Sequence, residues 1–166
     1  MLNSKKKLEK FLQQQRFKRV IPFLKGAVLD FGGNEGELQP YIKGAYTLVN
    51  YDYSKMEQGN CFNTIVALAV IEHIEIKTVS SIFEKFKSVL TEEGSIVLTT
   101  PTPLAKPVLE FLAFVGLLDK KNIEEHKHYW NKSELTHLAD ENGFSVSIYK
   151  KFQFGFNQFV IFNHKK

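Results

Sequence analysis

A glycine-rich stretch at residues 27–38, which reads AVLDFGGNEGEL, limits more than any other feature what this chain can fold into. A short apolar run ends in Asp30, and glycines follow at Gly32, Gly33 and Gly36. Glycine has no Cβ atom, so the backbone of such a turn can come within contact distance of a ligand. We therefore expect a buried strand, a tight turn and then a helix whose first amide groups face the turn.

The spacing of these glycines argues against a dinucleotide-binding fingerprint. A G-x-G-x-x-G motif that starts at Gly32 would need glycine where the chain has Asn34 and Glu37. The chain instead reads Asp-x-Gly-Gly-Asn-x-Gly, with Asp30 at the strand end two residues before the first glycine. From this stretch alone, a cofactor cradle and an ordinary strand-to-helix turn are equally good interpretations.

The length and composition of the chain favour one globular domain over residues 1–166. With 43% hydrophobic and 24% charged residues, a chain of this length can bury a core of its own. Its one cysteine, Cys61, excludes an intramolecular disulfide and favours a reducing compartment. No apolar stretch of a cleavable signal follows the lysine-rich start, so we expect a cytoplasmic protein. The most apolar run, residues 104–118, is too short and too interrupted to be a transmembrane segment.

Positive charge is concentrated near the N-terminus. Residues 1–25 hold eight Lys or Arg and one Glu, whereas the whole chain has a net charge of +4. We predict a basic helix over residues 1–24 that packs on the sheet edge or covers the ligand site. Its charges would allow contact with phosphates, nucleic acid or an anionic membrane, but a solvated helix face is the preferred interpretation. Nucleic acid is therefore not the expected partner.

A second acid follows the next predicted strand. Residues 46–52 form an apolar run that ends in Asp52, about 20 residues after the glycine turn. In nucleotide-binding α/β folds, an acid at this position hydrogen-bonds the ribose hydroxyls. The alternative interpretation is an aspartate that only caps the turn after it.

The remaining pattern predicts a Rossmann-like, doubly wound α/β fold. A near-continuous apolar run at residues 61–74 is typical of a central parallel strand that is buried on both faces. The last runs, at residues 144–150 and 156–162, predict a C-terminal antiparallel hairpin on this mostly parallel sheet. The other expected elements are helices at residues 38–42, 78–90 and 133–141, the last two capped by Thr78 and Ser133, and a strand at residues 95–100.

Several short motifs occur in an order that resembles the class I S-adenosylmethionine-dependent methyltransferases. The glycine turn is similar to their D-x-G-x-G-x-G motif, and AVIEHI, TEEGSIVLTTP, EEHKHYWNKSEL and ENGF follow it in that order. The resemblance spans about residues 26–164 and points to small-molecule enzymes related to the ubiquinone-biosynthesis O-methyltransferases. It implies methyl transfer to a small molecule, with S-adenosyl-L-methionine as the cofactor.

The resemblance also implies roles for individual residues. Asp30 and the glycine turn would hold the methionine part of the cofactor, and Asp52 would hold the ribose hydroxyls. Glu72 and His73 would line the mouth of the site beside the sulfonium. The implied cofactor-binding residues are Asp30, Gly32, Gly33, Asn34, Gly36, Asp52, Tyr53, Glu72 and His73.

The chain departs from the family pattern in two places. Asn34 replaces the middle glycine, and asparagine is the side chain that best tolerates a left-handed conformation. Between Asp52 and the strand that begins near Asn63, too few residues are left for a helix and another strand. We therefore expect the third strand of the family fold to be absent or vestigial. The adenine side would then be open, or covered by the N-terminal helix or by Met56 and Phe62.

Histidine is the expected proton acceptor for methyl transfer to a hydroxyl, because it titrates near neutral pH. We predict His126 as the catalytic base, since the family carries a histidine at this place, with His73 as the other candidate. A hydrogen-bonded rim residue is an equally good interpretation of His73. His126 and His128 lie two residues apart, but no third ligand has a recognisable spacing, so no metal site is expected.

Residues 104–130 would form the pocket for the methyl acceptor. Tyr129 and Trp130 offer aromatic walls, which suggests a small-molecule acceptor with a hydrophobic or aromatic part. For Phe111 and Phe114, packing in the core is the preferred interpretation.

The leading hypothesis is an S-adenosylmethionine-dependent methyltransferase that acts on a small molecule. The alternative is a catalytically inactive methyltransferase-like domain that serves as a binding or scaffold module, and the shortened segment after Asp52 motivates it. The oligomeric state and the accepting atom stay open at this point.

Overall fold

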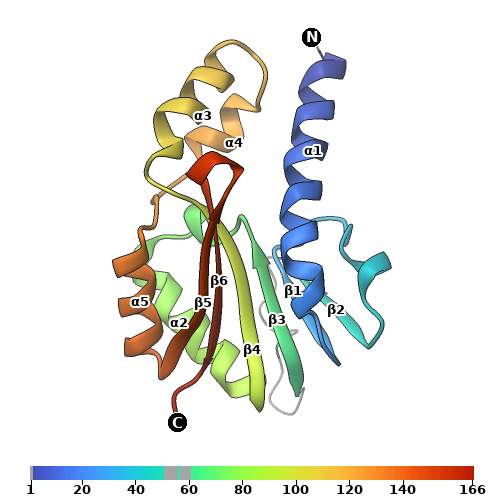
Figure 1. The fold of residues 1–166 in the computed structure, drawn as a ribbon, viewed down its shortest axis with the longest axis vertical. Coiled ribbons are helices and arrows are strands. Elements are labelled where there is room, and N and C mark those ends of the chain that lie inside the picture. Colours follow the sequence, from blue (N-terminus) through green and yellow to red (C-terminus); the bar gives the residue numbers. More distant parts are fainter. Residues whose placement is uncertain (1, 51–55, 57–60) are drawn as a thin grey trace.

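The computed structural model describes the backbone of residues 2–50, 56 and 61–166, and side chains from residue 6 onward within these ranges (Figure 1). The helices are α1 (Leu2–Val20), α2 (Ile76–Val89), α3 (Ala105–Phe114), α4 (Lys120–Glu124) and α5 (Lys132–Glu141). The strands are β1 (Val28–Phe31), β2 (Tyr46–Val49), β3 (Phe62–Leu68), β4 (Leu90–Pro101), β5 (Phe144–Phe152) and β6 (Asn157–His164). Short 3-10 turns lie at η1 (Ile21–Phe23), η2 (Gln39–Tyr41), η4 (Ile71–His73) and η5 (Gln153–Gly155).

All six strands form one sheet in the order β2-β1-β3-β4-β6-β5. The pairs β1–β2, β1–β3 and β3–β4 are parallel, whereas β6 runs antiparallel to both β4 and β5. The sheet is therefore mostly parallel and ends in an antiparallel hairpin, which confirms the fold class expected from the sequence. Sheets of this kind place their ligands at the carboxyl ends of the parallel strands.

Helices α2 and α5 cover one face of the sheet and build the larger core (Figure 1). The apolar positions of α2 recur at helical spacing, so one stripe of the helix faces the strands. Phe83 and Phe86 from this stripe pack with Phe144 and Phe162 of the sheet. A fully buried phenylalanine stabilises a fold by about 1.5–3 kcal/mol, so this cluster contributes strongly to the packing of α2 on the sheet.

Helix α1 covers part of the other face with its C-terminal end. Phe17 and Val20 pack with Val28, Val66 and Phe159 of the sheet. The N-terminal part of α1 rises beyond the carboxyl ends of the parallel strands, beside α3 and α4 (Figure 1). The basic helix predicted from the sequence thus packs on the sheet and also extends over the end where ligands bind.

No α-helix lies between the glycine turn and β2, so the expected helix with amides that face the turn is absent there, and the brief helix expected at residues 38–42 is the 3-10 turn η2. Residues 33–38 form turns, and the single 3-10 turn η2 then leads back toward β2. Pro40 lies inside η2 and has no amide hydrogen to donate to a longer helix. Leu38 is buried against the second face of the sheet, which holds the segment in this compact form.

Two helix starts also differ from the sequence prediction. Helix α2 begins at Ile76, two residues before Thr78. Helix α5 begins after Asn131, whose Oδ1 accepts a 3.0 Å hydrogen bond from the backbone of Glu134. The carboxylate of Glu134 accepts one in return from the backbone of Asn131, at 2.7 Å. This reciprocal capping box satisfies two amides at once, so it outcompetes a cap at Ser133.

The segment after β2 bears on the third-strand prediction. In the described part of the sheet, β2 is an edge strand. Residues 51–55 and 57–60 lie outside the described residues, and so do the predicted ligands Asp52 and Tyr53. The absence of the third strand therefore stays a prediction.

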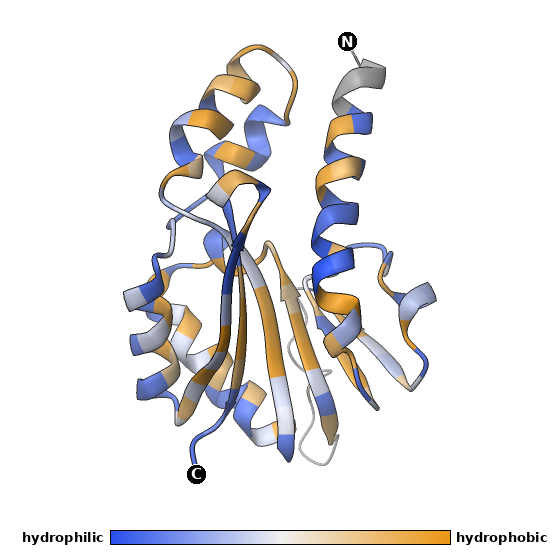
Figure 2. Cartoon of the chain, viewed as in Figure 1, coloured by the Kyte–Doolittle hydropathy of each residue, from blue (hydrophilic) through white to orange (hydrophobic). Residues whose placement is uncertain are grey.

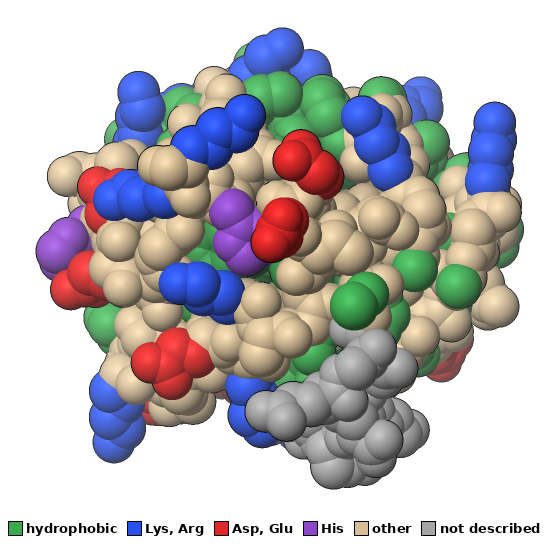
Figure 3. Space-filling model, turned by 90° about the horizontal axis from the view of Figure 1, so that it is seen from below, with side chains coloured by type: hydrophobic (Ala, Val, Ile, Leu, Met, Phe, Trp, Pro, Cys, Tyr) green, Lys and Arg blue, Asp and Glu red, His purple; other side chains and the backbone are tan. Residues whose placement is uncertain are grey.

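Hydrophobic residues line the central strands and also continue along α3 (Figure 2). The core-packing interpretation of Phe111 and Phe114 was wrong, because 62% and 85% of their surfaces are exposed. Helix α3 stands beyond the end of the sheet, where no other helix or strand of the described residues covers its outer side (Figure 1). At the opposite end of the molecule, Lys and Arg side chains are interspersed with Asp and Glu (Figure 3).

None of the described helices has the length and apolar character that a membrane crossing requires.

Candidate active site

A cavity of about 1130 Å³ opens at the carboxyl ends of β1 and β3. The glycine turn and η4 form its floor, α1 forms one wall, and α3, α4 and the segment after α4 form the other. The chain crosses from β1 to β2 on one side, and β3 lies on the other side of β1. Such a change of direction leaves a crevice between the first strand and its neighbour, which is the standard ligand site of open α/β sheets.

The glycine turn has the backbone shape that its sequence predicts. Gly32 and Asn34 are left-handed, with φ of +77° and +50°, so asparagine does replace the middle glycine of the motif as expected. A Cβ atom at Gly33 would overlap the carboxylate of Asp30. The backbone therefore passes close to this acid, and a larger residue at position 33 would displace the Asp30 side chain.

Asp30 lies at the base of the cavity and is only 2% exposed. Its Oδ2 accepts a 2.7 Å hydrogen bond from the hydroxyl of Tyr46 on β2. The pKa of Asp30 is raised to about 6, mainly by burial and to a smaller extent by the nearby charge of Glu37, while the Tyr46 hydrogen bond opposes both. Burial therefore makes the charged form of this carboxyl group unfavourable in the free protein.

Asn50 follows β2 and lines the same cavity. It was not predicted as a site residue from the sequence. Its Nδ2 donates a 2.8 Å hydrogen bond to the carbonyl oxygen of Asn34 and so ties β2 to the glycine turn. Its Oδ1 is buried and has no hydrogen-bond partner among the described residues. A buried acceptor without a partner is costly, and groups of this kind are rare outside functional sites. The sequence feature that could have indicated Asn50 is its position at the end of a predicted strand, two residues before Asp52.

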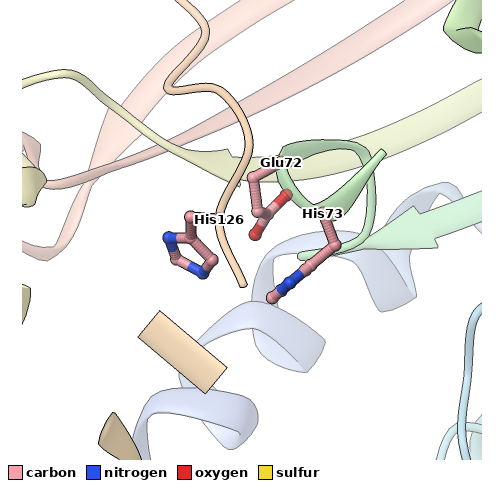
Figure 4. Close-up of side chains that lie close together, drawn as sticks. All are labelled: Glu72, His73 and His126. Atoms are coloured by element: carbon pink, nitrogen blue, oxygen red, sulfur yellow. The ribbon is translucent and has the colours of Figure 1, made fainter. Parts of the chain in front are cut away.

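Glu72, His73 and His126 come together on the far side of the cavity (Figure 4). Glu72 and His73 belong to η4 directly after β3, whereas His126 belongs to the segment after α4. The amides of Lys127 and His128 both donate to the carbonyl oxygen of Glu72, at 2.7 and 3.2 Å. These two bonds hold the distant segment against η4 and bring the histidine rings to a centroid distance of 4.6 Å.

Burial controls the charges of this cluster. Glu72 is 1% exposed, and burial raises its pKa to about 7, although a 2.9 Å hydrogen bond from Thr100 and the charge of Arg16 oppose the shift. Burial lowers the pKa of His73, against the charge of Glu125. Burial and the neighbouring His73 lower the pKa of His126 to about 4. Both imidazoles are therefore neutral near pH 7, with lone pairs available to a ligand.

The side chain of Tyr129 orients His126. The Tyr129 hydroxyl lies 2.9 Å from Nδ1 of His126. When Nδ1 carries the proton and donates it to this hydroxyl, Nε2 keeps its lone pair. Tyr129 is thus a positioning residue, whereas Trp130 is buried and donates a 3.3 Å hydrogen bond to the carbonyl of Ile71. The expectation that Trp130 forms a pocket wall was therefore wrong.

The structure brings most of the predicted site residues to one cavity. Its lining includes the predicted residues Asp30, Gly32, Gly33, Asn34, Glu72, His73 and His126. Gly36 instead packs against the Tyr46 hydroxyl, outside this lining. His128 turns away and lies 3.1 Å from Glu134. Arg16 of α1 also lines the cavity and was not singled out in the sequence, because its neighbour Glu72 is distant along the chain.

Comparison with known proteins gives a family and a fold. The family model described as methyltransferase domain matches residues 4–147 of this chain. A search of curated proteins found no match.

Solved structures with the same fold include methyltransferases. Magnesium protoporphyrin IX methyltransferase from Synechocystis PCC 6803, solved with bound S-adenosylhomocysteine, has a TM-score of 0.63 and 16% identity, over 92% of this chain and 84% of that chain. The PH0226 protein from Pyrococcus horikoshii OT3 has a TM-score of 0.66 and 15% identity, over 92% of both chains. The pyocyanin biosynthetic protein PhzM has a TM-score of 0.69 and 13% identity, but this chain covers only 55% of it. At sequence identities this low, the similarity to these structures shows a shared fold and nothing more.

Proposed function

The chain belongs to the methyltransferase domain family, and from this premise we propose that it transfers the methyl group of S-adenosylmethionine to a small-molecule acceptor. One observation carries the proposal: the glycine turn and the Glu72–His73–His126 cluster open into a single cavity. A donor on the turn would therefore face an acceptor beside the cluster.

The cofactor end of the cavity offers suitable polar groups. The left-handed turn at Gly32 and Asn34 exposes backbone to the cavity, and the Asp30 carboxyl lies beneath it. Asn50 lines this end of the cavity, and its side-chain amide would hydrogen-bond a ribose hydroxyl. Asp52 would join it, as the sequence predicts. Structures of the same fold that hold S-adenosylhomocysteine are consistent with this assignment.

Methyl transfer requires mainly that the methyl donor and the acceptor are aligned and that the acceptor hydroxyl loses one proton. Methyl transfer is an in-line displacement, and holding the two partners in place supplies about 7–11 kcal/mol in favourable cases. A hydroxyl acceptor also has to lose its proton. His126, oriented by Tyr129, and His73 both lie at the cavity in neutral form and would receive this proton, with His126 the weaker base because its pKa is lowered to about 4.

The other wall of the cavity is suited to an apolar acceptor. Leu109 of α3, Leu118 and Ile123 line it opposite α1. Apolar walls with a few polar groups are typical of sites that bind small organic ligands. The acceptor would therefore carry a hydrophobic part beside its reacting oxygen.

Calorimetry with S-adenosylhomocysteine tests the cofactor assignment. We expect a binding heat and a raised melting temperature for the wild type. Asp52→Ala should weaken binding by about 10- to 100-fold, because a carboxylate on ribose hydroxyls contributes about 1.5–3 kcal/mol. Asp140→Ala is the matched control, since Asp140 is exposed and paired with Lys165 on the opposite part of the molecule. Absence of any heat at millimolar ligand would end the proposal.

A second candidate function is that of an inactive methyltransferase-like binding module. The observation that favours it is the missing helix after the glycine turn in the described residues, since a helix would aim its amides at the ligand. This candidate predicts that the wild type binds no S-adenosylhomocysteine. The same titration therefore separates the two functions.

A further inference from the structure

We propose that Glu72, His73 and His126 form a binding site for one divalent transition-metal ion, which binds the oxygen of the methyl acceptor. The acceptor part of this inference rests on the proposed function, whereas the metal site stands on its own geometry. The spacing of these residues in the sequence does not reveal the site, because Glu72 and His73 lie far along the chain from His126.

The three side chains already face a common space at the cavity (Figure 4). One ligand atom of each lies within 4.8 Å of the other two. Ligand atoms around a bound zinc ion are about 3.3 Å apart, since the bonds are about 2.0–2.2 Å long and tetrahedrally arranged. Small rotations of the two half-buried imidazoles would therefore close the site without any movement of the backbone.

Two of the three proposed ligands have a hydrogen-bond partner that orients them, as ligands in metal sites usually do. Thr100 donates a 2.9 Å hydrogen bond to Oε2 of Glu72, which fixes the carboxylate. The Tyr129 hydroxyl lies 2.9 Å from Nδ1 of His126 and fixes the ring. Metal-bound histidines and carboxylates are usually oriented by such outer partners. The backbone bonds from Lys127 and His128 to Glu72 hold the two halves of the site together.

The donor set indicates the kind of ion. Two imidazole nitrogens and one carboxylate suit Zn²⁺, Mn²⁺ or Fe²⁺, whereas Ca²⁺ and Mg²⁺ prefer oxygen ligands alone. Three protein ligands leave open positions, as in catalytic metal sites. Arg16 is the positive side chain that interacts with Glu72 here, so a bound ion would share the negative charge of Glu72 with Arg16.

The ion would take over the activation of the acceptor. An acceptor hydroxyl bound to the ion loses its proton to water more readily, because the ion stabilises the resulting oxyanion. A lone pair of this oxygen forms a bond to the methyl carbon of S-adenosylmethionine. The bond from that carbon to sulfur breaks, and its electron pair stays on sulfur to give neutral S-adenosylhomocysteine. The products are the methyl ether and one proton, with no change of oxidation state.

Metal titrations of the full chain test the site directly. The protein is stripped with a chelator and titrated with Zn²⁺ and Mn²⁺ by calorimetry, and with Co²⁺ by visible absorption. We expect about one ion per chain and a cobalt spectrum typical of nitrogen ligands. His126→Gln and His73→Gln should each weaken binding by more than about tenfold, since loss of even an outer partner costs about 10- to 100-fold. His128→Gln is the control, because His128 faces Glu134 instead.

The outcomes separate this inference from the proposed function. Stoichiometric binding that both cluster variants weaken, and that His128→Gln keeps, supports the site. No binding by the wild type, or equal binding by all variants, overturns it. His73 is half-buried on a 3-10 turn, so its variant tests the site even if His126→Gln fails to fold. S-adenosylhomocysteine should bind the stripped protein as well as the untreated one, so loss of the metal site leaves the cofactor assignment in place.

Discussion

The hydroxyl of Tyr46 donates a 2.7 Å hydrogen bond to Oδ2 of Asp30, which links β2 to the acid at the base of the cavity. Asp30 is almost fully buried, and this hydrogen bond only partly offsets the cost of its charge. The buried charge of Asp30 under the glycine turn therefore lowers the free energy of unfolding. Buried groups that are kept in this way are commonly functional.

Removal of the Asp30 charge should stabilise the protein at high pH. The pKa of Asp30 is about 6 in the folded protein, against about 4 in an unfolded chain. Between these values the folded protein binds a proton that the unfolded chain has lost, so stability falls as the pH rises through this window. Asp30→Asn should therefore be more stable than the wild type by about 1–3 kcal/mol at pH 8, and equal to it near pH 4.

Urea unfolding at both pH values measures this difference. The rise in the pKa of Glu72 affects both proteins alike, so the comparison isolates Asp30. Asp30→Asn should also bind S-adenosylhomocysteine more weakly, which would show that the charge serves the ligand. A variant that is less stable than the wild type at pH 8 contradicts this account.

Gly33→Ala should impair the cofactor site, because the new Cβ atom would overlap the Asp30 carboxylate. We expect a loss of about 1–3 kcal/mol in the free energy of unfolding, as for other overpacked sites, and no measurable heat with S-adenosylhomocysteine. Gly116→Ala is the comparison. Its Cβ atom would meet nothing within 4 Å, so it should cost only the strain of a left-handed alanine and leave binding unchanged. Equal binding by Gly33→Ala and the wild type would count against the turn as a cradle.

Asn50→Ala should weaken binding of S-adenosylhomocysteine by about tenfold, because it removes both the hydrogen bond to Asn34 and an amide of the cavity wall. Stability should change little, since the unpartnered Oδ1 is itself unfavourable in the free protein. Calorimetry measures the affinity, and thermal melting measures the stability. Asn122→Ala, on the acceptor side of the same cavity, should bind the cofactor product as the wild type does. Equal losses in the two variants would refute a specific role for Asn50.

Asn131→Ala should lower the free energy of unfolding by about 1 kcal/mol, because it removes the cap of α5. Ser133→Ala should have almost no effect, since Asn131 and not Ser133 caps the helix. Chemical denaturation of the two variants measures both values. The opposite ranking would show that the helix starts where the sequence pattern placed it.

The sequence predicted well those features that depend on neighbouring residues. The turn from Asp30 to Asn34 follows from local chemistry, since glycine and asparagine permit its left-handed backbone. The burial of β3 and the C-terminal hairpin follow from apolar runs in the same way. The cap of α5 was misplaced by two residues because Asn131 and Ser133 are both good caps, and only the bond to Glu134 decides between them.

Features that depend on distant contacts were not predictable. The meeting of Glu72 with His126 requires the backbone bonds between η4 and the segment after α4. The exposure of Phe114 follows from the place of α3 beyond the sheet, which no local pattern reveals. The short turn η2 replaces a helix because Leu38 is drawn into the core, and this too is a tertiary effect.

A crystal structure grown with S-adenosylhomocysteine tests the central claim most directly. We predict the methionine part over the turn at Gly32–Asn34, the ribose hydroxyls within hydrogen-bond distance of Asn50, and the sulfur facing His73 and His126. Electron density for the ligand at this place would support the cofactor assignment and show the path of the methyl group. A cavity without the ligand at millimolar concentration, or a ligand bound elsewhere on the molecule, would contradict it.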